Sequence, residues 1–306
     1  MIPRVSVIIA TYNYGKYITD CLESLRNQSF KNFETIIVDD GSTDNTADIV
    51  KEFADDRIRY FFQVNQGQAT AKNIGIKVSL GEFLCFLDSD DYIDEKNIEE
   101  RVLFLDTHND IDWAFTDTYF VDASKNILDK GSEVFSVIPD DQFLNNVFYQ
   151  LLALGNFITS DTVMMRRHCI ESIGYFHETL RFHEDYELWL RLAQKFRCGY
   201  IHQPLNFMRK HQQSLGTENY ERDRAGMLKF MDYVESIYPN DIKSIRSIWQ
   251  NRRADAWNHL GQSAYNRFEH KASLIYFMNS IKSYPLQIFA YKKIFSNLSL
   301  LLRNHL

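Results

Sequence analysis

Short apolar runs alternate with stretches of helical periodicity along the first part of the chain. The apolar runs are rich in β-branched and aromatic residues and too short for buried helices, so they predict buried strands at 5–10, 33–38, 58–62 and 82–87. Apolar residues at helical spacing and capping residues predict helices at 15–28, from Thr43 or Asp44 to about Phe53, and at 67–79. Strands that alternate with helices indicate an α/β fold, with a mostly parallel central sheet flanked by helices.

The rest of the chain carries less regular patterns. Helices are predicted at 95–107, 141–153 and 184–195, and extended segments at 111–121, 157–166, 198–202 and 205–209. From about Tyr220 the pattern is helical throughout. Within it, one stretch resembles a single tetratricopeptide-like helical pair, through Trp257, Leu260, Gly261, Phe277 and Pro285. Because one pair cannot build a solenoid, we expect a larger domain at 1–216 and an all-helical appendage at 217–306.

The composition restricts which partners the protein binds and in which cellular compartment it works. The net charge of −7 argues against nucleic acid as the main partner, since a phosphate backbone needs a basic face. The four cysteines are widely spaced and form no CxxC pair, which favours a reducing compartment over a structural zinc site. No apolar run approaches the roughly 20 residues that a membrane span needs. We therefore expect a cytoplasmic protein.

The last stretch, PLQIFAYKKIFSNLSLLLRNHL, mixes apolar residues with Lys292, Lys293 and Arg303. Two interpretations stay open. The C-terminal helices could contact the inner face of the cell membrane at its surface, or they could pack against the catalytic domain as ordinary helices.

Polar clusters follow three of the predicted strands. They are Thr11-Tyr12-Asn13, Asp39-Asp40 and Asp88-Ser89-Asp90-Asp91. In mainly parallel sheets, ligands bind beyond the carboxyl ends of the strands, where these clusters would meet. The sequence therefore predicts one candidate site at this edge of the sheet.

The residues restrict the kind of nucleotide site. The first strand is followed by ATYNYGKY, which lacks the G-x-G-x-x-G turn, and no GxxxxGK[ST] motif is present. A diphosphate would then have to be neutralised by a metal or by basic side chains. Asp88, Asp90 and Asp91 supply hard oxygen ligands suited to Mg²⁺ or Mn²⁺. The alternative is an acidic turn that only caps the next helix.

Two later segments are further candidates, each with a plain structural alternative. Glu184 and Asp185 precede a predicted helix. They could act as a general base, kept ionised by the helix terminus, or merely cap the helix. Arg209, Lys210 and His211, with Ser214 beyond, could close over a diphosphate or form a solvated basic turn.

The motifs together resemble those of the inverting family 2 glycosyltransferases, which have the GT-A type nucleotide-diphospho-sugar transferase fold. The resemblance rests on VSVIIATYN, VDDGSTDNT, QATAKNIGIKVSLGEFLCFLDSDDYI, HEDYELWLRLA and RKHQQSLGT, in the family's order and spacing. It covers about residues 1–216 and leaves out the helical C-terminal region. One departure is Lys72, where the family often has arginine, so that two-pronged phosphate recognition is lost.

The resemblance implies a role for each matching residue. The backbone of Ala10-Thr11-Tyr12 and the Asp40 side chain would hold the base, usually uracil, and Asp39 would support the turn. Asp88 would lie near the ribose and metal, and Asp90 would bind the metal directly. Asp185 would be the catalytic base, with Glu184 assisting at the acceptor. The remaining residues expected at the nucleotide-sugar are Asn13, Lys72, Asn73, Ser89, Arg209, His211 and Ser214.

The implied function is that of an inverting, metal-dependent glycosyltransferase with Mn²⁺ or Mg²⁺ as cofactor. The donor would be a nucleotide-sugar, with a UDP-sugar as the first choice. The acceptor would be a glycan or lipid-linked glycan of the cell envelope, by analogy alone. Two alternatives are a sugar nucleotidyltransferase, whose glycine-rich turn is missing here, and a non-catalytic binding or scaffold module.

Overall fold

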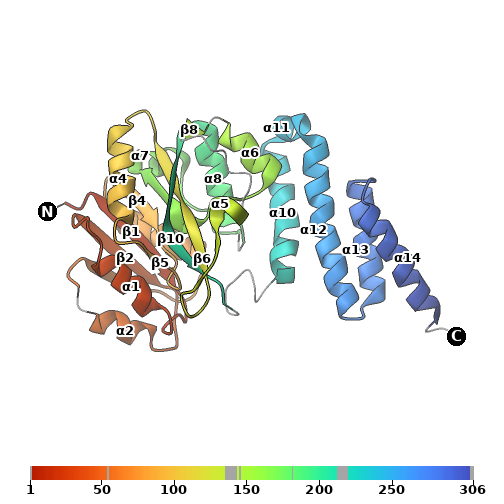
Figure 1. The fold of residues 1–306 in the computed structure, drawn as a ribbon, viewed down its shortest axis with the longest axis horizontal. Coiled ribbons are helices and arrows are strands. Elements are labelled where there is room, and N and C mark those ends of the chain that lie inside the picture. Colours follow the sequence, from red (N-terminus) through yellow and green to blue (C-terminus); the bar gives the residue numbers. More distant parts are fainter. Residues whose placement is uncertain are drawn as a thin grey trace. The chain divides into compact units, whose positions relative to one another are not determined.

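The computed structural model describes residues 2–53, 55–134, 143–144, 146–180, 182–211 and 220–303. The chain divides into two compact units, Met1–His211 and Gln212–Leu306. A mixed sheet runs through the first unit (Figure 1). Its strand order is β3-β2-β1-β4-β9-β6-β10-β5, with β7 beside β6 and β8 beside β10. Helices flank this sheet, so the predicted α/β class is confirmed.

The strands and helices of the first unit follow the chain in near alternation. The strands are β1 (Val5–Thr11), β2 (Phe33–Asp39), β3 (Ile58–Phe62), β4 (Phe83–Phe86), β5 (Tyr92–Ile93), β6 (Trp113–Val121), β7 (Ile127–Lys130), β8 (Phe143–Leu144), β9 (Val163–Arg166) and β10 (Cys198–Arg209). The helices are α1 (Ile18–Arg26), α2 (Thr46–Glu52), α3 (Gln68–Val78), α4 (Asn97–Thr107), α5 (Gly131–Val134), α6 (Val147–Leu154), α7 (Arg167–Ile173) and α8 (Glu184–Lys195), with a 3₁₀ turn, η1, at Ser160–Thr162.

The sheet changes direction in its middle. Strands β1 to β4 pair in parallel, but β9 runs antiparallel to both of its neighbours, β4 and β6. The sequence pattern predicted an extended segment at 157–166 but neither its direction nor the 3₁₀ turn inside it. The two extended segments predicted at 198–202 and 205–209 are one strand, β10, whose register against β6 shifts around Pro204.

Burial on both faces explains why the first strands read as continuous apolar runs. Every residue of β1 and β2 is buried. Since successive side chains of a strand point to opposite faces, Val7 and Ile9 join the core cluster with Leu22 of α1, whereas Ile8 meets α3 at Gly75. Helices α1 and α3 therefore cover opposite faces of the same strands.

The second unit is helical throughout its described residues. It contains α10 (Tyr220–Ile237), α11 (Pro239–Ser244), α12 (Arg246–Asn266), α13 (His270–Ser283) and α14 (Ile288–Arg303). Helices α12 and α13 approach closely because Gly261 leaves room for the ring of Phe277. Their likeness to a tetratricopeptide pair stays a prediction. Among the described helices of the whole chain, none has the length and apolarity to cross a membrane.

Gly199 on β10 provides a test of the packing between the sheet and α4. A Cβ atom at Gly199 would lie 2.4 Å from Cε1 of Phe104. Gly199→Ala should therefore lower the free energy of unfolding by about 1–3 kcal/mol in urea denaturation, because the buried ring cannot move freely aside. Adding Phe104→Leu should make the double variant more stable than the two separate losses predict. An unchanged stability of Gly199→Ala would show that this contact is wrong.

Candidate functional site

The ends of the parallel strands meet at one edge of the sheet. Thr11, the last residue of β1, pairs with Asp39, the last residue of β2. The next residue, Asp40, donates its backbone N–H to the carbonyl of Thr11 at 2.8 Å. On the other side of β1, the N–H of Leu87 donates to the carbonyl of Ile8, so that Asp88 follows directly beyond β4.

Asn13 shapes the loop beyond β2. It lies in the left-handed region, with φ 59°, which asparagine tolerates better than most residues. Its Oδ1 accepts the N–H of Thr43 at 2.7 Å, and its own N–H donates to Oγ of Ser42 at 2.8 Å. These bonds join the loop after β1 to the loop after β2. Asn13 therefore fixes the conformation of the two loops.

The two carboxylates of Asp39 and Asp40 have different surroundings. Asp39 accepts hydrogen bonds from Ser42 N–H and from the hydroxyl of Tyr60, both at 2.7 Å. Asp40 accepts the backbone N–H groups of Gln66 and Gly67, each at 2.8 Å. Asp40 thereby fixes the loop that leads into α3, and its contact with a base stays a prediction.

The acidic turn sends its side chains in different directions. Oδ1 of Asp88 accepts a hydrogen bond from Gln68 at 3.2 Å. Oδ2 of Asp90 lies 2.9 Å from Nε2 of His211. Asp91 and Ser89 are buried, and Asp91 accepts the backbone N–H of Arg209 at 2.6 Å. Asp91 thus anchors the turn to the end of β10, while Asp88 and Asp90 lie above it.

Asp161, on η1, belongs to the same cluster and was missed from the sequence. Carboxylate oxygens of Asp88, Asp91 and Asp161 lie within 4.8 Å of one another, an arrangement able to hold a cation. Oδ1 of Asp161 also accepts the N–H of Asp88 at 2.9 Å. A lone acidic residue within the apolar segment FITSDTVMM was the available signal, because unpaired carboxylates are rarely buried.

Burial raises the pKa values of three carboxyls in and around the acidic turn. Burial, followed by the charge of Asp88, raises the pKa of Asp161 to about 7. Burial, followed by the charge of Asp161, raises the pKa of Asp91 well above its usual range. The contact between the two carboxyls by itself raises the pKa of Asp91 and lowers the pKa of Asp161. Burial and then Asp88 also raise the pKa of Asp90, so a bound cation would relieve the repulsion there.

Lys72 lies among the carboxylates. The residue is only 1 % exposed, and its ammonium donates to Oγ of Ser160 at 3.1 Å and lies 3.6 Å from Oδ1 of Asp88. Burial by itself lowers the pKa of Lys72, but the charges of Asp88 and then Glu184 outweigh it, so the pKa is raised. Lys72 therefore pairs with the acidic turn and also feels the negative charge at the start of α8.

Asn73, the neighbour of Lys72, is occupied within the protein. Its Nδ2 donates to the carbonyl of Phe176 and to Oε1 of Glu178, both at 2.9 Å. Its Oδ1 accepts the N–H of Phe176 at 2.9 Å. These bonds fasten α3 to the segment after α7, and a contact between Asn73 and a nucleotide-sugar stays a prediction.

Glu184 and Asp185 form the first turn of α8, after His183 in the left-handed region. Asp185 accepts a hydrogen bond from Nδ2 of Asn156 at 3.1 Å. The helix terminus was expected to favour the ionised form, but burial raises the pKa of Asp185, and Lys72 only partly opposes this. Burial likewise raises the pKa of Glu184 to about 7. The direction is therefore opposite to the one expected, because desolvation outweighs the helix terminus.

Arg209 is a buried connector. Its guanidinium donates to Oδ2 of Asp20 at 2.8 Å and to the carbonyl of Asp90 at 3.0 Å. It also lies over the rings of Tyr17 and Tyr92, 5.0 and 5.7 Å from their centroids. The interpretation as a solvated basic turn is therefore wrong for Arg209, while its contact with a diphosphate stays a prediction.

His211 stands beside the acidic turn, stacked on Tyr17 with 4.5 Å between ring centroids. The imidazole therefore has a fixed position next to Asp90. Ser214, which was expected in the same loop, lies outside the described residues.

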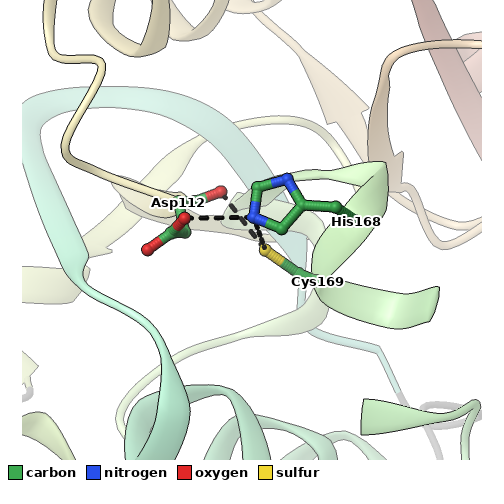
Figure 2. A group of neighbouring side chains, drawn as sticks. All are labelled: Asp112, His168 and Cys169. Atoms are coloured by element: carbon green, nitrogen blue, oxygen red, sulfur yellow. Dashed lines mark hydrogen bonds and ion pairs between the residues drawn. The ribbon is translucent and has the colours of Figure 1, made fainter. Parts of the chain in front are cut away.

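A second cluster of metal-ligating side chains lies elsewhere in the first unit (Figure 2). Nε2 of His168 is 3.1 Å from Oδ1 of Asp112, and the Cys169 thiol donates to the Asp112 carbonyl at 3.6 Å. Burial, followed by the charge of Asp112, raises the pKa of this thiol to about 12. Asp112 also accepts the N–H of Arg197 at 3.1 Å. These bonds tie the starts of β6, α7 and β10 together, so the cluster has a structural role. We call it the clamp.

The fold and the site together define an α/β transferase-like domain with an acidic turn at the carboxyl edge of its sheet. The family model described as Glycosyl transferase family 2 matches residues 6–173, more than half of the chain. The chain belongs to this family.

Three known proteins illustrate the likeness. An uncharacterized glycosyltransferase of Rickettsia felis is 35 % identical over 235 residues, which are 76 % of this chain and 37 % of that protein. S. aureus TarS 1–349, solved in complex with UDP-GlcNAc, shares the fold with a TM-score of 0.65 and 23 % identity over 96 % of this chain and 89 % of that chain. The mannosyltransferase PcManGT of Pyrobaculum calidifontis, solved with GDP-Man and Mn²⁺, has a TM-score of 0.62 and 16 % identity over 99 % of this chain and 81 % of that chain.

The first curated relatives are longer than this chain, so the similarity covers only part of each of them. The chain spans between 32 % and 42 % of the first curated relatives that it matches. The family membership therefore applies to the matched domain, and the solved structures show its fold.

The raised pKa of Glu184 predicts a pH-dependent stability. A carboxyl whose pKa rises on folding binds its proton more tightly in the folded state, so its contribution is complete below about pH 4.5 and is lost as the pH rises to about 7. Glu184→Gln should therefore flatten the decline in the free energy of unfolding over this range, as measured by urea denaturation at several pH values. Exposed Glu133→Gln serves as the control and should leave the slope unchanged. An equal slope in wild type and Glu184→Gln would contradict the assignment.

Proposed function

We propose that this protein is an inverting, metal-dependent glycosyltransferase that uses a nucleotide-sugar donor, with a UDP-sugar as the first choice. One observation carries the proposal. Buried Lys72 lies 3.6 Å from Asp88 of the acidic turn, and the charges of Asp88, Glu184 and Asp185 together raise its pKa, which supports a candidate cation-binding turn and a candidate base in one region of the domain. Curated relatives named as glycosyltransferases and a structural neighbour holding UDP-GlcNAc support it.

The strand ends of β1 and β2 suit the base and ribose of the donor. Oγ1 of Thr11 is buried and finds no hydrogen-bond partner among the described residues, and an unsatisfied buried hydroxyl favours a ligand atom there. The neighbouring Tyr12 side chain is 47 % exposed and offers a ring face for a base to stack on. The backbone of Ala10 and the carboxylate of Asp40 complete the expected base contacts.

The acidic turn suits a divalent cation. Asp90 and His211 place an oxygen and a nitrogen 2.9 Å apart, and Asp88 adds a second carboxylate from the same turn. Carboxylates favour Mg²⁺ or Mn²⁺. The neighbour PcManGT was solved with Mn²⁺. A cation held by Asp90, His211 and Asp88 would neutralise charge on the departing diphosphate.

Asp185 is the group best suited to accept the acceptor proton. In a single displacement, the acceptor oxygen forms a bond to the anomeric carbon, the bond from that carbon to the diphosphate oxygen breaks, and the hydroxyl proton passes to Asp185. Attack from the face opposite the leaving group inverts the configuration. Burial raises the pKa of this carboxylate and so makes it a stronger base, while Nδ2 of Asn156 and the N–H of Tyr186 each donate to one of its oxygens and orient it.

Removal of the base separates donor binding from transfer. Asp185→Asn keeps the size but cannot take up the proton, and its single amide oxygen can accept from either Nδ2 of Asn156 or the N–H of Tyr186 but not from both. We expect donor affinity within about twofold of wild type and a transfer rate lower by about 10²–10⁴-fold. Calorimetry with UDP-sugars measures the first, and nucleoside diphosphate release with an added glycan acceptor pool measures the second. Asp112→Asn, in the separate clamp, serves as the control; normal transfer by Asp185→Asn would exclude this base.

The metal assignment has its own test. Asp90→Ala and His211→Ala should each weaken Mn²⁺-dependent donor binding by about tenfold or more, because each removes one direct ligand and leaves its partner unpaired. Donor affinity is measured by calorimetry with Mn²⁺ and with a chelator. The wild type should lose affinity in the chelator, whereas the variants should change little. Equal donor affinity with and without Mn²⁺ in the wild type would contradict metal dependence. A separate outcome concerns the reaction itself: transfer of a nucleotidyl group instead of a sugar would favour the nucleotidyltransferase alternative.

A further inference from the structure

The part of α14 whose side chains the structure describes, 288–298, has the reverse of the usual arrangement of a surface helix. Within it the buried positions hold the small Ala290 and the polar Asn297, whereas Ile288 is 70 % and Phe295 72 % exposed. A helix that packs against a core normally buries its apolar side and exposes its polar side. The outward side of α14 must therefore be explained by something other than packing within this unit.

The exposed apolar residues form one face of α14. Ile288, Tyr291, Phe295 and Leu298 recur at the spacing of three and four residues that places side chains on one side of a helix, and exposed Lys292 lies at its edge. We call these five residues the outer face of α14. Helix α13 carries a similar exposed stripe, with Ile275 and Met278 between Lys271 and Lys282.

The inward side of α14 is fixed by polar bonds. Nδ2 of Asn297 donates to Oγ of Ser273 at 3.1 Å and to the carbonyl of Lys293 at 3.0 Å. Ser273 in turn donates to the carbonyl of Gly261 at 2.8 Å. A rotation of α14 that buried Phe295 would break this chain of bonds and leave polar groups unsatisfied. The outer face therefore stays exposed.

Charge indicates what covers the outer face. The whole chain has a net charge of −7, yet residues 270–306 contain five Lys and Arg residues and no Asp or Glu. A second copy of the chain would bring two basic surfaces together, and this repulsion disfavours self-association. A surface that is both anionic and apolar beneath its charges satisfies both features, and an anionic lipid bilayer has this character.

We propose that α14 docks this protein on the surface of an anionic lipid bilayer. The apolar residues of the outer face enter the boundary between headgroups and acyl chains, and Lys292, with Lys271 and Lys282 of α13, lies near the headgroup phosphates. The helix lies in the plane of the surface and does not span it, in keeping with the absence of a spanning helix from the described residues. The docking is independent of the proposed transferase activity.

Vesicle binding by the full chain tests the proposal. The chain should sediment with phosphatidylcholine vesicles that contain phosphatidylglycerol, more weakly with phosphatidylcholine alone, and less as salt rises. The double variant Ile288→Ser and Phe295→Ser should lose at least about tenfold in vesicle affinity, since two large apolar side chains no longer insert. Lys282→Glu with Lys292→Glu should lose about fivefold or more for each lysine.

Matched controls separate the outer face from general effects. Leu128→Ser and Lys51→Glu make the same changes at exposed positions of the first unit and should leave vesicle binding unchanged. If the apolar double variant fails to fold by circular dichroism, the lysine variants decide the question. Absence of sedimentation with anionic vesicles at low salt, equal binding to neutral vesicles, or equal losses in the controls would overturn the proposal. So would a dimer, seen in sedimentation velocity, that Phe295→Ser abolishes while vesicle binding persists.

Discussion

The buried ammonium of Lys72 is the interaction on which the rest of the site depends. Carboxylates converge on it from the acidic turn and from the first turn of α8, and their charges keep the lysine protonated despite its burial. Without that positive charge, Asp88 and Glu184 would face each other's repulsion in a region of low dielectric. A single lysine on α3 therefore permits two segments, distant in sequence, to present carboxylates at one place.

A second buried interaction, between Asp91 and Asp161, supports the acidic turn. Asp91 and Asp161 are both buried, and burial together with their mutual repulsion raises the pKa of Asp91 well above its usual range. The backbone N–H of Arg209 also donates to Asp91, so the end of β10 is tied to the turn from below. Because Asp91 holds the turn in place, the side chains of Asp88 and Asp90 are left to bind a cation and, through it, a diphosphate. The acidic turn is thus divided into a supporting half and a half available to ligands.

Much of the fold could be predicted from the sequence because its first strands are buried on both faces. Continuous apolar runs such as β1 and β2 leave few alternatives, and α8 was predicted with its observed bounds. The antiparallel direction of β9 could not be predicted, because direction depends on pairing with β4 and β6 rather than on local pattern. The short helix α7 was missed for a different reason, because seven residues carry little periodicity.

The site was predictable in its residues and less so in their surroundings. The motifs indicated Asp90 and His211, but only the fold reveals that their side chains meet. Arg209 was expected either to close over a diphosphate or to lie in a solvated basic turn, whereas Asp20 and two tyrosine rings hold its buried guanidinium in place. Asp161 has no motif at all. Such groups act through burial and long-range contacts, which local sequence patterns do not encode.

Buried polar groups have different roles in the two units. In the first unit, buried charge is concentrated at the edge of the sheet, where it can meet a charged ligand. In the second, the buried bonds of Asn297 and Ser273 fix the rotation of α14 and thereby hold apolar side chains in solvent. An exposed apolar face costs solubility unless a partner covers it. Its retention beside a segment without acidic residues therefore indicates that the face serves an interaction, and not only the packing of the helical unit.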